Sequence, residues 1–493
     1  MTNFTPTHEQ QECLTAFATG EAMTIEAGAG TGKTSTLRLL SESTDRTGLF
    51  IAFNKSVQLD AEASFPSNVE CRTAHSLAYK GMHRLGEKAL MRRLSGPRVT
   101  SRKTAEALGI PEQVQIGDSS GDEVFALRDF EIASAVMGTV RRYCYSADED
   151  INENHVPTLK GRENAHDHVV RIVLPYARAA WTDLNSFTGK LKFNHDHYVK
   201  IWALSHPKLT GFDFIMLDEA QDTNPVVAAV FNAQTNVQKI VVGDRCQAIY
   251  EWRGARDAIS GFKAPHHLKL SQSFRFGPSI ATEANKFLGL LRSPLTLSGT
   301  DSIDSAVETV SDPSCIIART NATVVQTAME YQAEGRKVAI VGGTREIEAF
   351  AKAARELQEG RKDTYHADLA AFGCWGQLQA YVATDEGADL RVMVKLIDNY
   401  GVDTVLEVCH NSVDESTADL IVTTAHKAKG REWSSVRIAN DFRPAEEQTD
   451  LPSVSELRLF YVAVTRAINR LDADAFSWIA DIAAESATQE VAA

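Results

Sequence analysis

The sequence predicts an α/β protein with two successive parallel-sheet domains, each interrupted by an inserted, largely helical segment. Three observations lead to this prediction. An apolar strand at 23–27 is followed by a Gly-rich loop and a helix, which is how a parallel α/β unit begins. A second set of short apolar strands starts at 315–318. Between the two sets, apolar residues recur at helical spacing.

The domain boundaries are placed where the pattern of apolar and charged residues changes along the sequence. We predict a first core domain with a helical insertion, then a second core domain with a smaller, acidic insertion. The first core domain comprises 1–79 and 206–270, with its helical insertion at 80–205. The second comprises 271–343 and 416–493, with its smaller insertion at 344–415. In the first insertion, the apolar residues from Val124 to Val140 recur at helical spacing and predict one long helix. A further helix is expected at 455–468.

Composition limits the classes of protein that fit. With 493 residues, 43% of them apolar and 24% charged, the chain has the profile of a globular protein of several domains. No apolar run is long enough to span a bilayer, so a cytoplasmic protein without a membrane partner is expected. The seven cysteines form no CxxC pair, which argues against a zinc ribbon or an iron–sulfur cluster. The net charge of −14 argues against a broadly basic surface for nucleic acid, but not against a narrow groove.

A Gly-rich loop follows the first strand and opens a helix. It reads Ala27-Gly28-Ala29-Gly30-Thr31-Gly32-Lys33-Thr34. Here the glycines allow backbone N–H groups to turn inward around phosphates. Lys33 would neutralise the β- and γ-phosphates, and the hydroxyl of Thr34 would hold Mg²⁺. The alternative, a turn that only opens a helix, fits poorly with Gly-Lys-Thr directly after an apolar strand.

Two carboxylates follow another apolar strand, at 214–217. Because the carboxyl ends of parallel strands meet at one edge of a sheet, Asp218 and Glu219 should lie beside the phosphate loop. Asp218 would hold Mg²⁺ through water, and Glu219 would orient and deprotonate the attacking water. The alternative is that the two carboxylates only form the acidic N-terminus of a helix. That interpretation leaves the upstream phosphate loop unexplained. The two motifs together predict hydrolysis of a nucleoside triphosphate.

Four more motifs lie downstream, at 243–255, 271–275, 424–433 and 456–467. In the first of them, Gln247 follows a strand and could reach the γ-phosphate. Tyr250 and Trp252 could stack on bases, which contributes about 1–3 kcal/mol per base without sequence preference. Tyr250 and Trp252 could instead be core aromatics, although the charged neighbours Glu251 and Arg253 weaken that interpretation.

With these motifs, the chain resembles the superfamily 1 helicases of the UvrD/Rep/PcrA group from residue 7 to 467. The segments 51–56 and 65–69 resemble most the F-box DNA helicases and their phage and bacterial relatives, although no F-box is visible. The resemblance implies two tandem P-loop NTPase (RecA-like) core domains that use ATP and Mg²⁺. It further implies 3′ to 5′ movement on single-stranded DNA, with duplex unwinding, in a bacterial or phage-infected cytoplasm.

The resemblance also implies roles for individual residues. Gln247, Arg275 and Arg466 would contact the γ-phosphate, the two arginines as fingers that stabilise transition-state charge. Gln10 would read adenine, Phe274 would stack on it, and Glu432 would accept a hydrogen bond from the ribose. The implied nucleic-acid contacts are Phe53, His75, Tyr250, Trp252, Arg253, Thr424 and His426.

Other possibilities stay open at this point. RNA is not excluded as a substrate, because stacking and phosphate contacts serve both nucleic acids. The chain could be a translocase that strips proteins from single strands with little unwinding, or a non-motor ATP-binding adaptor. The residues Lys33, Asp218, Glu219, Arg275 and Arg466 argue against the adaptor. A monomer or weak dimer is expected, and no protein partner is indicated.

Two weaker signals lie in the first insertion. The segment 141–145 alternates charge with aromatics, so it either lines the nucleic-acid path or is a solvated helix end. His195-Asp196-His197 has the composition of a metal site, but metal sites usually need three or four ligands and no partner cluster is evident. We therefore do not predict a metal site there.

Overall fold

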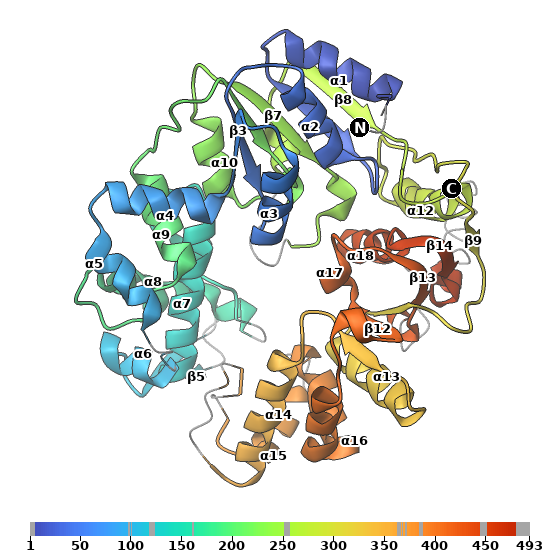
Figure 1. The fold of residues 1–493 in the computed structure, drawn as a ribbon. Coiled ribbons are helices and arrows are strands. Elements are labelled where there is room, and N and C mark those ends of the chain that lie inside the picture. Colours follow the sequence, from blue (N-terminus) through green and yellow to red (C-terminus); the bar gives the residue numbers. More distant parts are fainter. Residues whose placement is uncertain are drawn as a thin grey trace, which may run out of the picture.

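The computed structural model describes most of the chain. The described residues are 5–96, 99, 101–117, 124–159, 162–250, 257–361, 366, 368–369, 372–383, 388–443 and 451–479. Each of two six-stranded sheets forms the centre of one core domain. Figure 1 shows the core domains side by side, with a helical lobe projecting from each.

The first sheet has the strand order β3-β2-β6-β7-β1-β8, and all neighbouring strands are parallel. Its strands are β1 (Met23–Ala27), β2 (Gly48–Ala52), β3 (Val69–Thr73), β6 (Phe214–Leu217), β7 (Gln238–Gly243) and β8 (His266–Leu270). The helices around it are α1 (His8–Ala18), α2 (Lys33–Glu42), α3 (Lys55–Ser64), α10 (Pro225–Asn232) and α11 (Ala258–Gly261). β1, β2 and β6 are buried along their whole length, as expected for a parallel sheet that is covered on both faces.

Alternate side chains of each strand pack against the two helical layers. In β6, Met216 joins the cluster that contains α1, α2 and α3, whereas its neighbour Ile215 joins the cluster of α10 and α11. This alternation is the two-residue period of a strand. It fixes the sheet between its helices and brings the carboxyl ends of β1, β6 and β7 to one edge.

The second sheet repeats the plan with the order β11-β12-β10-β13-β14-β9, again with parallel neighbours. Its strands are β9 (Ala306–Val307), β10 (Cys315–Ala318), β11 (Val338–Ile340), β12 (Leu420–Thr424), β13 (Trp433–Ile438) and β14 (Ala467–Asp472). The helices of this domain are α12 (Pro278–Leu290), α13 (Asn321–Ala333), α17 (Ala425–Ala428) and α18 (Val454–Val464). These two sheets confirm the predicted fold class.

One predicted helix is too long at its C-terminal end. α18 stops at Val464, and the chain re-enters the sheet as β14 from Ala467. β14 pairs with β13 on one side and β9 on the other, and a longer helix would leave those two strands without this ladder partner. The prediction of a helix over 455–468 is therefore wrong for its last residues.

The first insertion is mostly helical. It contains α5 (Lys88–Met91), α6 (Ser101–Leu108), α7 (Asp129–Tyr145), α8 (His166–Leu184) and α9 (His195–Leu204), and it is entered through α4 (Ala74–Arg84). A two-stranded antiparallel pair, β4 (Gln113–Gly117) and β5 (Val124–Arg128), precedes α7. The prediction of one helix from Val124 to Val140 is wrong at its start, because Val124 and Leu127 lie in β5 and the helix begins at Asp129.

The second insertion is also helical. It contains α14 (Arg345–Gln358), α15 (Trp375–Val382) and α16 (Ala388–His410), and α16 breaks at Gly401, where φ is 79°. The helices share an apolar cluster with α13 of the second core domain, so this insertion is packed onto its own domain. Among the residues that the structure describes, we find no helix with the length and apolarity to cross a bilayer.

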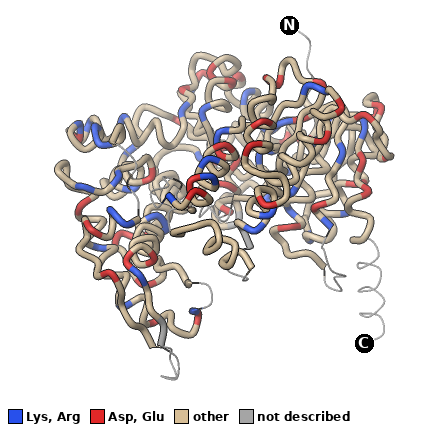
Figure 2. Tube along the Cα trace, turned by 90° about the horizontal axis from the view of Figure 1, so that it is seen from below, with Lys and Arg blue, Asp and Glu red and all other residues tan. Residues whose placement is uncertain are grey.

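Charges of both signs are interspersed along the trace rather than gathered on one face (Figure 2). The acidic balance of the sequence is thus spread over the molecule. The nucleic-acid site that the sequence predicts would consequently be a local feature.

Helices α4 and α9 approach each other closely at a glycine. A Cβ atom on Gly81 would lie 2.2 Å from the Cδ1 and Nε1 atoms of Trp202, a distance that the indole could accommodate only by moving. Gly81 therefore sets the spacing of the two helices, and with it the joint between the first core domain and its insertion.

We predict that Gly81→Ala lowers the melting temperature, although Ala favours a helix over Gly by about 1 kcal/mol. The overpacking should cost about 1–3 kcal/mol and outweigh that gain. Gly289→Ala in α12 is the matched control, because nothing lies within 4 Å of a Cβ there. Thermal unfolding of both variants checks this. A melting temperature that rises equally in both would contradict the packing argument.

Candidate functional site at the junction of the core domains

The phosphate loop is held in shape by its own backbone and by the second half of the chain. Gly30 and Gly32 have φ values of +72° and +76°, in the left-handed region that glycine adopts at little cost. The Thr31 hydroxyl donates to the Gly28 carbonyl at 2.9 Å. A Cβ on Gly30 would lie 2.5 Å from the Ser273 hydroxyl oxygen, so the loop accepts only glycine there.

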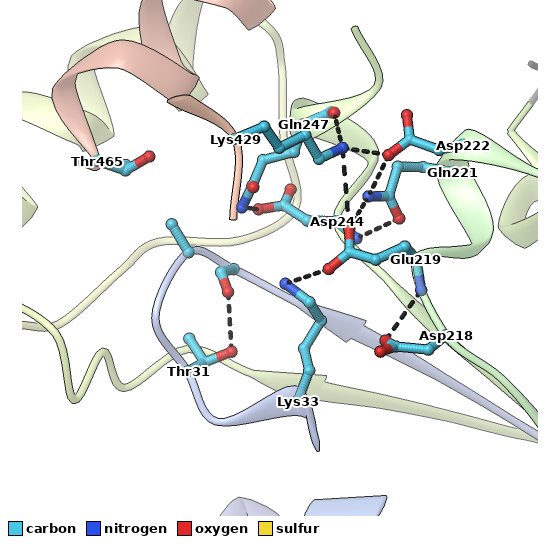
Figure 3. Close-up of polar contacts among 12 residues, drawn as sticks. Thr31, Lys33, Asp218, Glu219, Gln221, Asp222, Asp244, Gln247, Lys429 and Thr465 are labelled. Atoms are coloured by element: carbon cyan, nitrogen blue, oxygen red, sulfur yellow. Dashed lines mark hydrogen bonds and ion pairs between the residues drawn. The ribbon is translucent and has the colours of Figure 1, made fainter. Parts of the chain in front are cut away.

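The two predicted acidic residues lie beside the loop (Figure 3). Glu219 follows β6 with a left-handed backbone, φ 49°, which is a strained conformation for a residue with a side chain. Its Oε1 atom lies 3.6 Å from the Nζ atom of Lys33, and its N–H donates to the Asp218 carboxylate at 2.9 Å. Gln221 donates to Glu219 Oε2 at 2.5 Å, so the carboxylate is fixed from two sides.

The two carboxyl groups differ in electrostatic environment. Burial, together with the charge of Glu219, raises the pKa of Asp218 to about 7. Burial pushes the pKa of Glu219 upward too, but the positive charges of Lys33 and Lys429 outweigh it and hold that pKa well below its usual range. Glu219 is therefore the ionised member of the pair, as a general base must be.

The Asp218 carboxyl fits the role of a cation ligand. It is buried and accepts a hydrogen bond from the Glu219 N–H, and a bound cation would favour its ionised form over the neutral one. Thr34, the other predicted Mg²⁺ ligand, is exposed at the start of α2. Mg²⁺ usually keeps several waters and takes one or two protein oxygens beside phosphate. Among the described residues, no group of three or more His, Cys, Asp or Glu could hold a metal ion.

Both predicted arginine fingers lie at this junction. The Nε atom of Arg275 donates to Glu432 at 2.6 Å, and its Nη1 atom donates to the Thr465 carbonyl at 3.0 Å. Arg466 is buried and donates to the Gln247 side chain at 3.4 Å. Burial, reinforced by the nearby positive charge of Arg275, lowers the pKa of Arg466 to about 9.

Gln247 connects the two domains. Its amide donates to Asp244 at 2.6 Å on the first domain, while its side-chain oxygen accepts from Arg466 on the second. A side chain with contacts to both sides can respond to what occupies the space between them. The structure thus brings together the predicted γ-phosphate contacts Gln247, Arg275 and Arg466.

Two of the three predicted contacts with the nucleoside meet over the loop. A Cβ on Gly32 would lie 3.5 Å from the ring of Phe274 and 3.8 Å from the amide nitrogen of Gln10. Gln10 is buried, accepts from the Thr7 N–H at 3.0 Å and donates to Thr36 at 3.2 Å. Phe274 is 40% exposed, which leaves a ring face for a planar base. Glu432, the predicted ribose contact, is half-exposed and bound to Arg275.

A tyrosine of the second domain caps the phosphate loop, which sequence reasoning missed. The Ala29 N–H donates to the Tyr461 hydroxyl at 3.1 Å, and that hydroxyl donates to Asp244 at 3.1 Å. Tyr461 is buried among apolar residues of both domains. The sequence holds no local signal for this role, since Tyr461 is one aromatic in an apolar helix.

Lys429 is the second residue that sequence reasoning missed. Its Nζ atom forms an ion pair with the buried Asp222, lies 3.8 Å from Glu219 and donates to the Gln247 carbonyl at 2.6 Å (Figure 3). Lys429 follows α17 on the second domain, whereas these partners belong to the first. Burial raises the pKa of Asp222, although Lys429 opposes the rise.

The predicted strand contacts are only partly assembled. Phe53 and Tyr250 stack, with ring centroids 5.7 Å apart and planes 19° apart. The Tyr250 hydroxyl donates to the His426 carbonyl at 3.1 Å, which brings a second-domain residue to the pair. Thr424 is buried and its hydroxyl caps α17, so it lies inside the fold. Trp252 and Arg253 lie outside the described residues.

His75 is exposed at the start of α4 and lies apart from that group, next to the first insertion. Its Nε2 atom lies 3.8 Å from Asp196. The weak signal at 195–197 is thus explained by a contact between core domain and insertion.

The fold and the site together define the class of protein: a P-loop nucleotide-binding protein with two tandem RecA-like domains and a site between them. Two family models match the chain. Residues 203–264 match the UvrD/REP helicase N-terminal domain, and residues 419–471 match the UvrD-like helicase C-terminal domain. These segments contain the carboxylates and Lys429, respectively. In these two segments the chain is therefore similar to the N- and C-terminal domains of UvrD-like helicases.

Curated relatives point the same way. The chain is 29% identical to F-box DNA helicase protein 1 of Schizosaccharomyces pombe over 500 residues, which is 92% of this chain and 55% of that protein. It is also 29% identical to F-box DNA helicase 1 of Gallus gallus, over 94% of this chain and 48% of that protein. A probable DNA helicase II homolog of Mycoplasma pneumoniae matches 16% of the chain and 12% of its own length at 34% identity. The chain spans about half the length of the first two relatives.

We predict that Lys429→Met lowers the melting temperature by several degrees, because it leaves Asp222 buried without its cation. Breaking a buried ion pair costs about 3–5 kcal/mol. Lys427→Met is the matched control, since Lys427 lies 3.9 Å from Glu346, a side chain that is 82% exposed. Equal melting temperatures for the two variants, in thermal unfolding without nucleotide, would contradict the buried pair.

Proposed function

We propose that this protein hydrolyses ATP between its core domains and uses the energy to move 3′ to 5′ on single-stranded DNA, unwinding duplex as it advances. One observation carries the proposal. The loop, Lys33 and Glu219 of the first domain face Arg466 of the second across a junction bridged by Gln247. Closure on a nucleotide requires contacts from both sides, and this arrangement supplies them.

Each residue of the junction has a chemical task in hydrolysis. Lys33 and the loop N–H groups bind the phosphates. Glu219, held ionised, accepts a proton from the attacking water, with Gln221 fixing its orientation. Arg275 and Arg466 stabilise the charge that develops on the transferred phosphoryl group. Mg²⁺, held by Asp218 and Thr34, would neutralise phosphate charge when bound.

The same contacts offer a route from nucleotide to strand. Lys429 touches Asp222 and Glu219 at the acidic site, and its Nζ atom also lies 5.4 Å from the centroid of the Tyr250 ring. Tyr250 in turn stacks on Phe53. A change in domain closure would move both contacts together. Such a ligand-driven population shift would convert each hydrolysis cycle into a change of grip on the strand.

The substrate and the direction of movement rest on similarity. The two relatives that match over most of this chain are named DNA helicases, which supports DNA rather than RNA. The 3′ to 5′ direction comes from the resemblance to the UvrD group. Stacking on Phe53 and Tyr250 suits either nucleic acid.

We predict that single-stranded DNA stimulates ATP hydrolysis in this protein and that Glu219→Gln abolishes the hydrolysis while ATP still binds. The reason is that the amide cannot accept the proton of the water. Steady-state hydrolysis, measured with single-stranded DNA, single-stranded RNA and duplex DNA, checks it. Glu42→Gln, an exposed carboxyl on α2, is the control and should retain full activity. Hydrolysis that persists in Lys33→Ala would overturn the proposed site.

Arg466→Ala should lower the maximal rate by about 10³-fold or more, because one arginine finger is worth roughly 10³–10⁵ in rate. The Michaelis constant for ATP should change much less, since this arginine acts mainly on transition-state charge. A purely structural role would instead lower the melting temperature and leave the rate per folded molecule intact. Rate and unfolding measured on the same preparation separate the two.

Unwinding and protein displacement are separate outcomes of movement. A strand-displacement assay on duplexes with a 3′ or a 5′ tail tests the first and the direction at once. Release of a protein bound to single-stranded DNA tests the second. Unwinding from the 3′ tail supports the proposal, whereas protein release without unwinding favours a translocase. Absence of any strand-stimulated hydrolysis would favour the ATP-binding adaptor.

A further inference from the structure

A row of rings lies on α4, and only its first member, His75, is among the implied strand contacts. His75, Tyr79 and His83 follow one another at a spacing of four residues, which places them on one face of the helix. The rings of Tyr79 and His83 are 4.8 Å apart, centroid to centroid. Tyr79 is 44% exposed, and the His75 side chain is 49% exposed.

The neighbouring helix α9 adds two rings to this row. His195 and Tyr198 have centroids 6.4 Å and 6.2 Å from that of His75, and Tyr198 lies 6.1 Å from Tyr79. The Tyr198 hydroxyl donates to the His75 carbonyl at 3.4 Å, which ties α9 to the start of α4. Tyr198 is buried below the surface rings, whereas His195 is exposed. We call His75, Tyr79, His83, His195 and Tyr198 the α4–α9 ring row.

The ring row and Phe53, one member of the stacked pair, follow adjacent strands of the first sheet. β2 and β3 are adjacent, with Ala52 opposite Thr73 at their carboxyl ends. Phe53 follows Ala52 directly, and His75 lies two residues after Thr73. Phe53 and the ring row therefore leave the sheet from the same edge on neighbouring strands. The two sets of rings could be covered by one strand of nucleic acid.

Fixed polar contacts hold the start of the row in place. Asp196 accepts from the Tyr145 hydroxyl at 3.1 Å and pairs with His75. Burial raises the pKa of Asp196, but the hydrogen bonds and positive charge of its partners outweigh that effect and keep the pKa below its usual range. An ionised Asp196 can hold the His75 ring in place, and the His75 side chain stays 49% exposed. On the other side, Lys80 is half-exposed and lies 3.0 Å from Glu70.

We propose that the α4–α9 ring row is a second stacking site for single-stranded DNA, which extends the strand path from the Phe53–Tyr250 pair onto the first insertion. The proposal rests on the proposed function, because it assumes that the core binds a strand. Exposed planar rings at successive positions match the chemistry of unpaired bases, whose faces stack without regard to sequence. The row is surrounded by charges of both signs, which suits stacking on bases better than binding through phosphates alone.

The test is the dependence of binding on strand length. Fluorescence anisotropy would measure affinity for labelled oligo-dT of increasing length, from strands that cover only the core pair to strands that reach the insertion. For the unsubstituted protein, affinity should rise in a second step with length. In Tyr79→Ala/His195→Ala, that second step should be lost and affinity for the long strand should fall roughly tenfold, while the short strand binds as before.

Two further variants make the result decisive. Tyr79→Phe keeps the ring and should therefore keep most of the second step. If the hydroxyl were the important group, Tyr79→Phe would lose that step. Phe187→Ala removes an aromatic that is 71% exposed elsewhere on the same insertion, and should leave both steps intact. Melting temperatures confirm that each variant is folded. A parallel series with oligo-U reports whether RNA uses the same row.

The possible failures are distinguishable. Equal loss of affinity for short and long strands, or no loss in the double variant, would overturn the ring row as a second stacking site, whereas strand binding by the unsubstituted protein would still support the proposed function. Failure of the unsubstituted protein to bind any oligonucleotide would instead overturn the proposed function itself.

Discussion

The ammonium group of Lys429 is the contact on which the arrangement of this site depends most. It belongs to the second core domain, yet its partners Asp222, Glu219 and the Gln247 carbonyl all belong to the first. A buried cation needs such partners, because an isolated charge in the protein interior would destabilise the fold by several kcal/mol. The ion pair therefore favours the two domains being together. It also places one positive charge beside the carboxylate that would activate water.

Other contacts at the junction also hold the two core domains together. Tyr461 receives a hydrogen bond from the Ala29 N–H and gives one to Asp244, so an aromatic of the second domain sits against the phosphate loop. Arg466 reaches Gln247 from the same helix end. Tyr461 and Arg466 are buried, and each would lose its contact with the first domain if the domains moved apart. Nucleotide chemistry and domain position are thus linked by a small set of hydrogen bonds and one ion pair.

The sequence predicts what is local and misses what depends on the meeting of domains. The phosphate loop was predictable because strand, glycines and Gly-Lys-Thr are contiguous, and the carboxylates because they end a continuous apolar strand. β8 was not predicted, since His266-His267-Leu268-Lys269-Leu270 is largely polar and only Leu270 is fully buried. Val124 and Leu127 fit helical spacing, but pairing with Gln113–Gly117 decides in favour of a strand. Lys429 and Tyr461 could not be assigned, because their roles exist only across the junction.

The central claim is that the cross-domain contact of Lys429 couples strand binding to ATP hydrolysis. The most direct measurement compares the stimulation of hydrolysis by saturating single-stranded DNA in Lys429→Met, in Lys427→Met and in the unsubstituted protein, well below the lowest melting temperature of the three. The account predicts that Lys429→Met loses most of the stimulation although it still binds the strand, whereas Lys427→Met keeps it. Full stimulation of hydrolysis in Lys429→Met would contradict the claim.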